Sequence, residues 1–262
     1  MRIAAAQISC SLGDPNANAL KIRDFSAQAK EAGVDLIVFP EMTDTGYSMS
    51  VIQTQASPWT RGFVPQLQEI ARGLSIAIVS GISERDGESI YNSQIFVDGD
   101  GKVVSKYRKV HLFAGEPIAE HRCFSPGNEW TSFTFAGLRF GLSICYDLRF
   151  PEMYRKLAVE NGVNAFIVSS AWPFPRVEHF RTLAAARAIE NQSYMIVANR
   201  VGTDEDVSFC GRSTIIDPYG VILASASQGR EELIQAEISE DAVKSVRSQM
   251  EVFAHRRHDL YK

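Results

Sequence analysis

The sequence lacks several features that would narrow its class. No apolar run approaches the roughly 18 residues that a membrane span needs, and the N-terminal apolar run is too short for a signal peptide. The formal net charge of -4 leaves no basic excess for a nucleic-acid surface. No repeat, low-complexity tract or linker interrupts the 262 residues. We therefore expect a cytoplasmic protein without membrane or nucleic-acid partners, folded as a single domain over 1–262.

Cysteine is also scarce, with four in the chain. None pair as Cys-x-x-Cys and none lie near a histidine at zinc-finger spacing, so the sequence predicts no metal site and no cofactor. Disulfides are not expected in a cytosolic chain of this size. Cys10 and Cys210 lie in strand-like surroundings and are interpreted as buried core residues, whereas Cys123 lies in a loop-like stretch.

Strand and helix patterns alternate along the chain and are mixed with hairpins. Such a mixture predicts an α/β protein with mixed sheets covered by helices. Asp-Gly-Asp-Gly at 98–101 and Asp-Pro-Tyr-Gly at 217–220 are the hairpin signals. We expect strands at 2–9, 35–40, 75–81, 131–144 (two strands), 164–171, 194–199 and 232–238, hairpins at 93–107 and 211–226, and helices at 16–32, 64–72, 151–161, 177–191 and 240–249.

Cys145 stands where an apolar strand ends and Pro151 soon begins a helix. A lone cysteine at a strand end is usually a core thiol. A strand-to-helix turn, however, lifts the side chain out of the sheet and aims backbone N–H groups at the sulfur, which suits a nucleophile.

A cysteine nucleophile needs a proton acceptor, and histidine is the usual one. His255 and His258 lie in a charged tail that is interpreted as a solvated face, and His179 lies inside an expected helix. His111 and His121 remain possible, although neither has a carboxylate close by in sequence to orient it.

Glu41 offers a second route, because it directly follows the apolar strand at 35–40. Burial there would raise its pKa toward neutrality, as a general base requires. An exposed loop acid is an equally good interpretation. Lys109 ends a hairpin strand within a basic cluster that could simply be solvated, yet apolar residues follow it at once. An inward-pointing Lys109 would favour a thiolate or bind an oxyanion.

These three residues lie in short motifs, "FPEM" at 39–42, "YRKVHLF" at 107–113 and "ICYDLRFPE" at 144–152. In this order, the motifs resemble those of the nitrilase superfamily, the carbon–nitrogen hydrolases. Segments at 186–192, 211–220 and 253–261 also resemble family segments, so the likeness spans nearly the whole chain.

The resemblance implies a Glu-Lys-Cys triad in which Glu41 is the general base, Lys109 stabilises the tetrahedral intermediate and Cys145 is the nucleophile. It implies Glu120 as a second glutamate that positions Lys109, with Glu116 as its rival. By the geometry of the turn, the backbone N–H of Tyr146 would be the other oxyanion donor. The implied reaction is hydrolysis of a small linear amide to an acid and ammonia through a thioester.

The residues after Cys145 resemble the amidase branches, and the ω-amidase group most of all, which acts on amides of small dicarboxylic or 2-oxo acids. Arg149 is a candidate reader of a substrate carboxylate, although a salt bridge with Asp147 or Glu152 is the favoured alternative. Three aromatic residues are candidate pocket walls, unless they are simply core: Phe113, Trp172 and Phe174.

The family fold is a four-layer αββα sandwich with two mixed β-sheets. Family members usually form homodimers through the helices after the nucleophile, here 152–161 and 177–191. An N-carbamoyl amide hydrolase and a nitrilase are the alternatives within the superfamily. A non-catalytic binding or scaffold protein and a thiol redox protein are alternatives of other classes.

Overall fold

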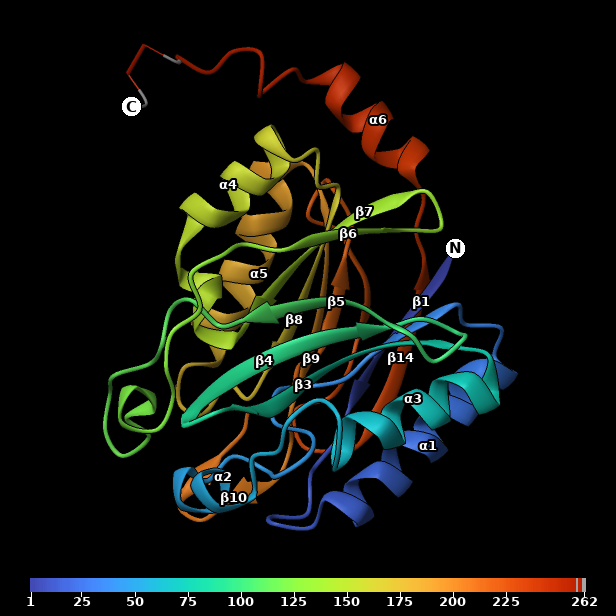
Figure 1. Cartoon of the computed structure of the whole chain (residues 1–262). Helices are drawn as coiled ribbons and strands as arrows, with labels where there is room; N and C mark the ends of the chain where they lie inside the picture. The colour runs from blue at the N-terminus through green and yellow to red at the C-terminus, as the bar shows by residue number, and fades with distance from the viewer. Residues whose placement is uncertain (258, 261–262) are drawn as a thin grey trace.

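Two six-stranded sheets stack face to face in the computed structural model, which describes residues 1–257 and 259–260 (Figure 1). His258 and Tyr261 of the tail lie outside these described residues. The first sheet has the strand order β14 (Glu232–Glu237), β1 (Arg2–Gln7), β2 (Leu36–Val38), β3 (Ala77–Asp86), β4 (Ser89–Val97) and β5 (Val103–Arg108). The second has the order β13 (Ile222–Ser225), β12 (Thr214–Ile216), β9 (Tyr194–Asn199), β8 (Ala165–Ser170), β7 (Leu138–Ile144) and β6 (Ser132–Phe135).

Both sheets are mixed for the same reason. Strands joined through helices run parallel, as β1, β2 and β3 do in the first sheet and β7, β8 and β9 in the second. Strands joined by tight turns run antiparallel, as β4 and β5 do. The connecting helices are α1 (Pro15–Glu31), α2 (Met49–Gln55), α3 (Phe63–Leu74), α4 (Pro151–Glu160) and α5 (Val177–Asn191), and α6 (Glu240–Gln249) follows the last strand.

Alternation along β1 shows how the layers are built. Ile3 and Ala5 join the core that includes both sheets, whereas Ala4 and Ala6 pack with residues of α1 and α3. On the other side, Phe180 of α5 belongs to the same core as the second sheet. Helices therefore cover both outer faces, with α1 and α3 on one and α4 and α5 on the other (Figure 1). The predicted four-layer αββα sandwich is confirmed.

Some elements differ from the expectations. A short 3-10 helix, η2 (Cys145–Arg149), separates β7 from α4. Strand β3 runs beyond the expected end at 81 as far as Asp86 and forms a hairpin with β4. Its polar end resembles a loop in sequence, but Arg108 pairs with the buried Glu84 there. Helix α2 and the small hairpin of β10 (Thr203–Asp204) and β11 (Val207–Ser208) were not expected. Over the described part of the chain, every helix is too short or too polar to cross a membrane.

Candidate active site

Glu41 lies in the loop that follows β2, and strand β3 holds this loop closely. The backbone N–H of Gly81 donates to Pro40 O at 3.0 Å, and Gly81 O accepts from Thr43 N at 2.9 Å. A Cβ atom at position 81 would lie 2.6 Å from the Glu41 Cα atom, so only glycine permits this approach. The next residue, Met42, has a positive φ of 53°, a strained conformation outside glycine. The loop thus places the Glu41 side chain in the fully buried interior.

Lys109 binds both predicted glutamates. Its Nζ atom donates to Glu41 Oε1 at 2.9 Å and to Glu120 Oε1 at 2.8 Å. Glu120 begins a 3-10 turn, η1 (Glu120–Arg122), and its Oε2 accepts from the backbone N–H of Phe113 at 2.6 Å. The carboxylates and the ammonium are inaccessible to solvent. We call Glu41, Lys109 and Glu120 the catalytic cluster.

Two side chains that the sequence did not indicate donate further hydrogen bonds to the cluster. Asn92 Nδ2 donates to Glu41 Oε1 at 2.6 Å and to Glu120 Oε1 at 3.1 Å. The hydroxyl of Tyr47 donates to Glu120 Oε1 at 2.7 Å. A run of three polar residues at 92–94 inside an otherwise apolar strand is the signal that could have indicated Asn92. Tyr47 has no such signal, because only the fold brings it to Glu120.

Burial sets the proton affinities in the cluster. Burial raises the pKa of Glu41, although the charge of Lys109 opposes the rise. For Lys109, burial disfavours the ammonium, but the charges of Glu120 and Glu41 outweigh it and raise the pKa. Lys109 is therefore a permanent cation, and Glu41 is a stronger base than an exposed glutamate.

Cys145 follows β7 in a strained turn, with a φ of 44°. Asp147 fixes this turn, because its Oδ2 accepts from the backbone N–H of Ile144 at 2.9 Å. Asp147 also accepts hydrogen bonds from the hydroxyl of Tyr107 at 2.8 Å and from the backbone N–H of His111 at 3.1 Å. Asp147 therefore joins the nucleophile turn to the chain on both sides of Lys109.

The thiol of Cys145 is protonated in this environment. Burial, and then the charge of Glu41, raise its pKa well above the ordinary value, with Lys109 acting in the opposite direction. A protonated thiol next to a carboxylate of raised pKa needs general-base activation at the moment of attack. The arrangement suits a Cys–Glu pair in which the proton moves as the sulfur reacts.

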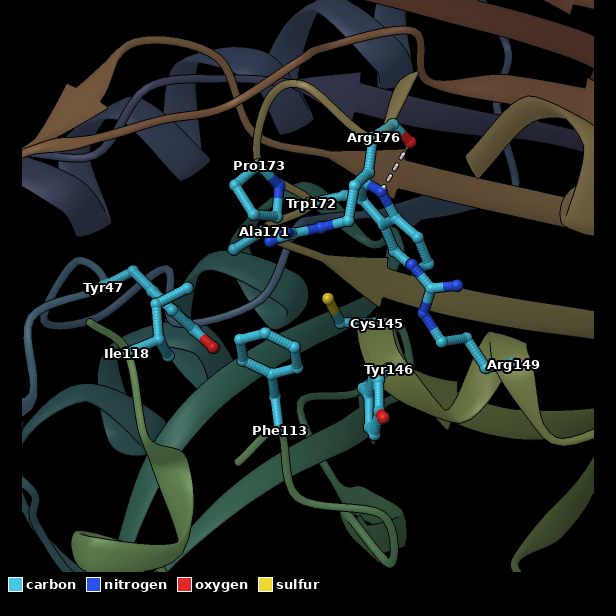
Figure 2. Close-up of a pocket in the computed structure, with 10 residues that line it drawn as sticks. All are labelled: Tyr47, Phe113, Ile118, Cys145, Tyr146, Arg149, Ala171, Trp172, Pro173 and Arg176. Carbon is cyan, nitrogen blue, oxygen red and sulfur yellow. Dashed lines mark hydrogen bonds between the residues drawn. The ribbon is translucent and has the colours of Figure 1, made fainter. Parts of the chain in front are cut away.

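Cys145 opens into a narrow cavity of about 320 Å³, a volume that includes the mouth. Figure 2 shows its sulfur pointing into the space between Phe113, Ile118 and Trp172. Tyr146 and Arg149 line the same cavity. The structure thus brings Phe113, Tyr146, Arg149 and Trp172 to the thiol, as the sequence interpretation expects.

Other expectations about the surroundings were wrong. Among the described residues, Arg149 forms no salt bridge with Asp147 or Glu152, since its guanidinium lies 4.8 Å from the centre of the Trp172 ring. Glu116 does not compete for Lys109, because it pairs with Arg122 at the surface. Phe174 lines a neighbouring hollow instead of the Cys145 cavity.

His111 has an oriented ring that the sequence did not indicate. Its Nδ1 atom lies 2.8 Å from Asp147 Oδ1, and the ring stacks on Phe150. His111 therefore has the carboxylate partner that was missing in sequence, but it is part of the support of the turn. Within residues 1–257 and 259–260, no three His, Cys, Asp or Glu side chains form a group that could hold a metal ion.

Comparisons with known proteins agree with this geometry. The family model for carbon-nitrogen hydrolases matches residues 2–248. A 2-oxoglutaramate amidase from Bacillus subtilis is 36% identical over 261 residues, covering 99% of this chain and 98% of that protein. The structure of Saccharomyces cerevisiae Nit3, a member of branch 10 of the nitrilase superfamily, has a TM-score of 0.89 at 31% identity, covering 98% of this chain and 96% of Nit3.

A second solved structure bears on the nucleophile. It is a variant of the amidase from Nesterenkonia sp. AN1, with the acetamide moiety of fluoroacetamide added covalently at its active site cysteine. Its TM-score is 0.88 at 28% identity, covering 100% of this chain and 95% of that one. The resemblance stated from the three motifs is confirmed. The chain belongs to the carbon-nitrogen hydrolase family of the nitrilase superfamily and is a hydrolase of carbon–nitrogen bonds.

Proposed function

We propose that the protein hydrolyses a small linear amide to a carboxylic acid and ammonia through a thioester on Cys145. The observation that carries this proposal is the fully buried catalytic cluster beside a thiol that opens into a cavity. Relatives named as amidases support the choice of an amide.

In the first half-reaction, Glu41 accepts the thiol proton while the sulfur of Cys145 attacks the amide carbon. The oxyanion forms between the Lys109 ammonium and the backbone N–H of Tyr146, and each such donor lowers the barrier by about 3 kcal/mol. The carbon–nitrogen bond then breaks, and the nitrogen leaves as ammonia with the proton that Glu41 had accepted.

In the second half-reaction, Glu41 accepts a proton from water, and the resulting hydroxide attacks the thioester. The carbon–sulfur bond breaks, the proton returns to the sulfur, and the acid leaves. Glu120 acts through Lys109. It keeps the lysine charged and fixes its Nζ atom, with Tyr47 and Asn92 holding the carboxylate in turn.

The proposal extends to the substrate's far end. Among the residues that the structure describes, two arginines, Arg149 and Arg176, line the cavity, and no acidic residue does. Arg149 makes no salt bridge among the described residues; its guanidinium lies over the Trp172 ring, and one of its terminal nitrogens is 3.3 Å from His179 Nδ1, so its positive charge is not neutralised by an acid. We propose that Arg149 binds the free carboxylate of a dicarboxylic monoamide. Relatives named 2-oxoglutaramate amidase and omega-amidase support this substrate class.

Ammonia release from a small panel of compounds tests the proposal. We expect kcat/KM for propionamide to exceed that for propionitrile by more than about tenfold, which is roughly 1.4 kcal/mol of transition-state stabilisation. Equal rates, or a preference for the nitrile, would contradict it. Carbon dioxide released together with ammonia from an N-carbamoyl compound would indicate the carbamoyl hydrolase instead.

The role of Arg149 needs its own measurement. We expect succinamate to be preferred over butyramide, and Arg149→Gln to remove that preference while butyramide turnover stays the same. Arg181→Gln is the matched control, because Arg181 is an exposed residue of α5 paired with Glu178. A loss of stability with an unchanged substrate ratio would show that Arg149 is structural.

We also propose a homodimer through α4 and α5. Ala184 and Ala188 of α5 are buried within this chain, but Ile189 on the same helix is 54% exposed. Light scattering after size exclusion should give twice the monomer mass, and Ile189→Asp should shift the equilibrium toward monomer. A monomeric parent protein at micromolar concentration would contradict the proposal.

A further inference from the structure

Ser170 ends strand β8 next to the turn that carries the nucleophile. Where β7 pairs with β8, Ile144 lies beside Ser169. Cys145 follows Ile144 and Ser170 follows Ser169, so Cys145 and Ser170 lie at the same end of two neighbouring parallel strands. The carbonyl of Ser170 accepts from the backbone N–H of Arg200 at 3.1 Å, which holds the Ser170 backbone in the sheet. The Ser170 side chain therefore starts from a fixed point beside the nucleophile turn.

The hydroxyl of Ser170 is buried, and within the described part of the chain no hydrogen bond of ordinary distance and angle reaches it. Its neighbour Ser169 is equally buried, yet the Ser169 hydroxyl donates to Phe39 O at 2.7 Å and accepts from Gln94 Nε2 at 2.8 Å. A buried hydroxyl without a partner costs stability, so such a group in a folded protein needs an explanation. The Ser170 hydroxyl can donate to a group that becomes a better acceptor during the reaction.

The sulfur of Cys145 is such a group. Burial, and then the charge of Glu41, raise the pKa of the thiol well above its ordinary value, whereas Lys109 and the hydroxyl of Ser170 act in the opposite direction. A neutral thiol is a weak acceptor, but a charged acceptor forms hydrogen bonds that are shorter and about twice as strong. The contact between the Ser170 hydroxyl and the sulfur therefore strengthens as the thiol loses its proton.

We propose that Ser170 is a further catalytic residue, whose hydroxyl donates a hydrogen bond to the sulfur of Cys145 as negative charge develops there. This inference rests on the proposed reaction at Cys145. In the attack, the thiol proton moves to Glu41 and a sulfur electron pair forms the carbon–sulfur bond. When the thioester is hydrolysed, that bond breaks and the pair returns to the sulfur. The proton of Ser170 stays on its own oxygen throughout, and its hydrogen bond lowers both barriers because it is stronger to the charged sulfur than to the neutral thiol.

Ser170 acts on the sulfur and not on the substrate. In the described part of the chain, the lining of the Cys145 cavity includes the next two residues, Ala171 and Trp172, but not Ser170. Ala171 also donates its backbone N–H to Glu41 Oε2 at 2.8 Å, a bond that a change of side chain at position 170 leaves in place. We therefore expect Ser170→Ala to lower kcat/KM for succinamate and butyramide alike, with their ratio constant within about twofold.

Alkylation of Cys145 by iodoacetamide, followed by peptide mass from pH 6 to 10, tests the hydrogen bond without turnover. Ser170→Ala should lower the alkylation rate at pH 8 at least about fivefold and move the pH–rate curve upward by about one pH unit, because the thiolate loses a donor. Ser26→Ala is the matched control, since the Ser26 hydroxyl of α1 is also buried without a hydrogen-bond partner among the described residues, and it should leave the curve unchanged. An unchanged curve in Ser170→Ala would overturn the inference.

Thermal unfolding separates this role from a structural one. The thermal midpoint should hold or rise in Ser170→Ala, as in Ser26→Ala, because each variant removes a buried hydroxyl without a partner. A lower midpoint with a normal alkylation rate would show that Ser170 is structural and would overturn the inference. Ser170→Thr keeps the hydroxyl, so its alkylation rate should lie nearer to that of the unaltered protein, and a rate as low as that of Ser170→Ala would also contradict the hydrogen bond. Ammonia release from butyramide by the unaltered protein tests the proposed function separately, so the two failures are distinguishable.

Discussion

Two neighbouring residues at the end of one hairpin, Arg108 and Lys109, each bind two carboxylates, yet the two clusters differ in chemistry. Arg108 pairs with Glu84 and Asp86 near the sheet edge, and we call these three the edge cluster. Lys109 pairs with Glu41 and Glu120 in the catalytic cluster. Both Glu84 and Glu41 are inaccessible to solvent, although Glu84 lies nearer the surface of the protein.

The difference lies in what each carboxylate receives. Burial would raise the pKa of Glu84, but hydrogen bonds from Arg108 and Ser93 outweigh it and lower the pKa, and Lys106 adds a second cation. Glu41 shares a single ammonium with Glu120, and burial raises its pKa. Together with Lys106, the edge cluster balances two cations against two acids, whereas the catalytic cluster has two acids and one cation. We interpret the neutralised Glu84 as a structural ion-pair member, and the contrast supports the proposed role of Glu41 as the base.

Removing the thiol should have the largest effect. Cys145→Ala should lower kcat for amide hydrolysis by at least about 10⁴-fold, because no other group can form the thioester. Cys123→Ala is the control, since Cys123 lies outside the cavity lining, and it should retain activity. When the reaction of the unaltered enzyme with a slowly hydrolysed ester is quenched, mass spectrometry should show an acyl adduct on the Cys145 peptide. An adduct that persists in Cys145→Ala would contradict the assignment.

Replacing the two buried glutamates should give opposite patterns. Glu41→Gln should lower kcat at least about a hundredfold, while the thermal midpoint holds or rises, because the variant removes the excess charge of the catalytic cluster. Glu84→Gln should keep kcat within about twofold and destabilise the fold by about 1.5–3 kcal/mol, because the buried side chain loses its charged hydrogen bonds with Arg108 and Ser93. Activity assays and thermal unfolding on both variants check this. A large stability loss in Glu41→Gln with modest rate loss would make Glu41 a structural ion-pair member.

The sequence predicted the strand ends well, but it predicted poorly the contacts between residues that are far apart in the chain. Glu41 and Cys145 each follow an apolar strand, so the period of the pattern alone places them at a sheet end. Asn92 and Tyr47 reach the catalytic cluster only because β4 and the loop before α2 fold against it. The polar run at 92–94 could have marked Asn92 as unusual, but a short-range pattern does not show which residues it contacts.

Glu84 also shows that local sequence does not reveal long-range contacts, here because a strand was missed. Its neighbours look like a polar loop, and the strand exists because β4 pairs with it and Arg108 neutralises the buried acid. The expected salt bridge of Arg149 failed for a related reason. Asp147 was close in sequence, but its oxygens already accept from Tyr107, His111 and the turn itself. Proximity in sequence was a poor guide to which acid was free.

Two tyrosines sharpen the comparison at a smaller scale. Tyr47→Phe should lower kcat about tenfold with little change in KM, because the buried Glu120 loses a donor worth about 1.5 kcal/mol and Lys109 is held less well. Tyr91→Phe is the matched control, since Arg108 stacks on the Tyr91 ring in the edge cluster and the ring remains. Steady-state kinetics on both variants distinguish the roles. Equal rate losses would mean that tyrosine removal acts through general packing.

The smallest effect concerns how stability depends on pH. The pKa of Glu84 is lowered from 4.5, so its contribution is present above pH 4.5 and is lost as the pH falls through the lowered value. The pKa of Glu41 is raised from 4.5, so its contribution is full below pH 4.5 and is lost as the pH rises through the raised value. One group can change the free energy of unfolding by at most about 1.4 kcal/mol per pH unit.

Urea unfolding between pH 3 and 8 measures this dependence. Below pH 4.5, the free energy of unfolding should fall less steeply with decreasing pH in Glu84→Gln than in the unaltered protein. In Glu41→Gln, the gain in stability over the unaltered protein should be largest at pH 8 and shrink toward pH 4, because the acid it replaces is then protonated anyway. If the free energy of unfolding depended on pH in the same way for the two variants, the two glutamates would experience the same environment. The contrast between a structural glutamate and a basic one would then be wrong.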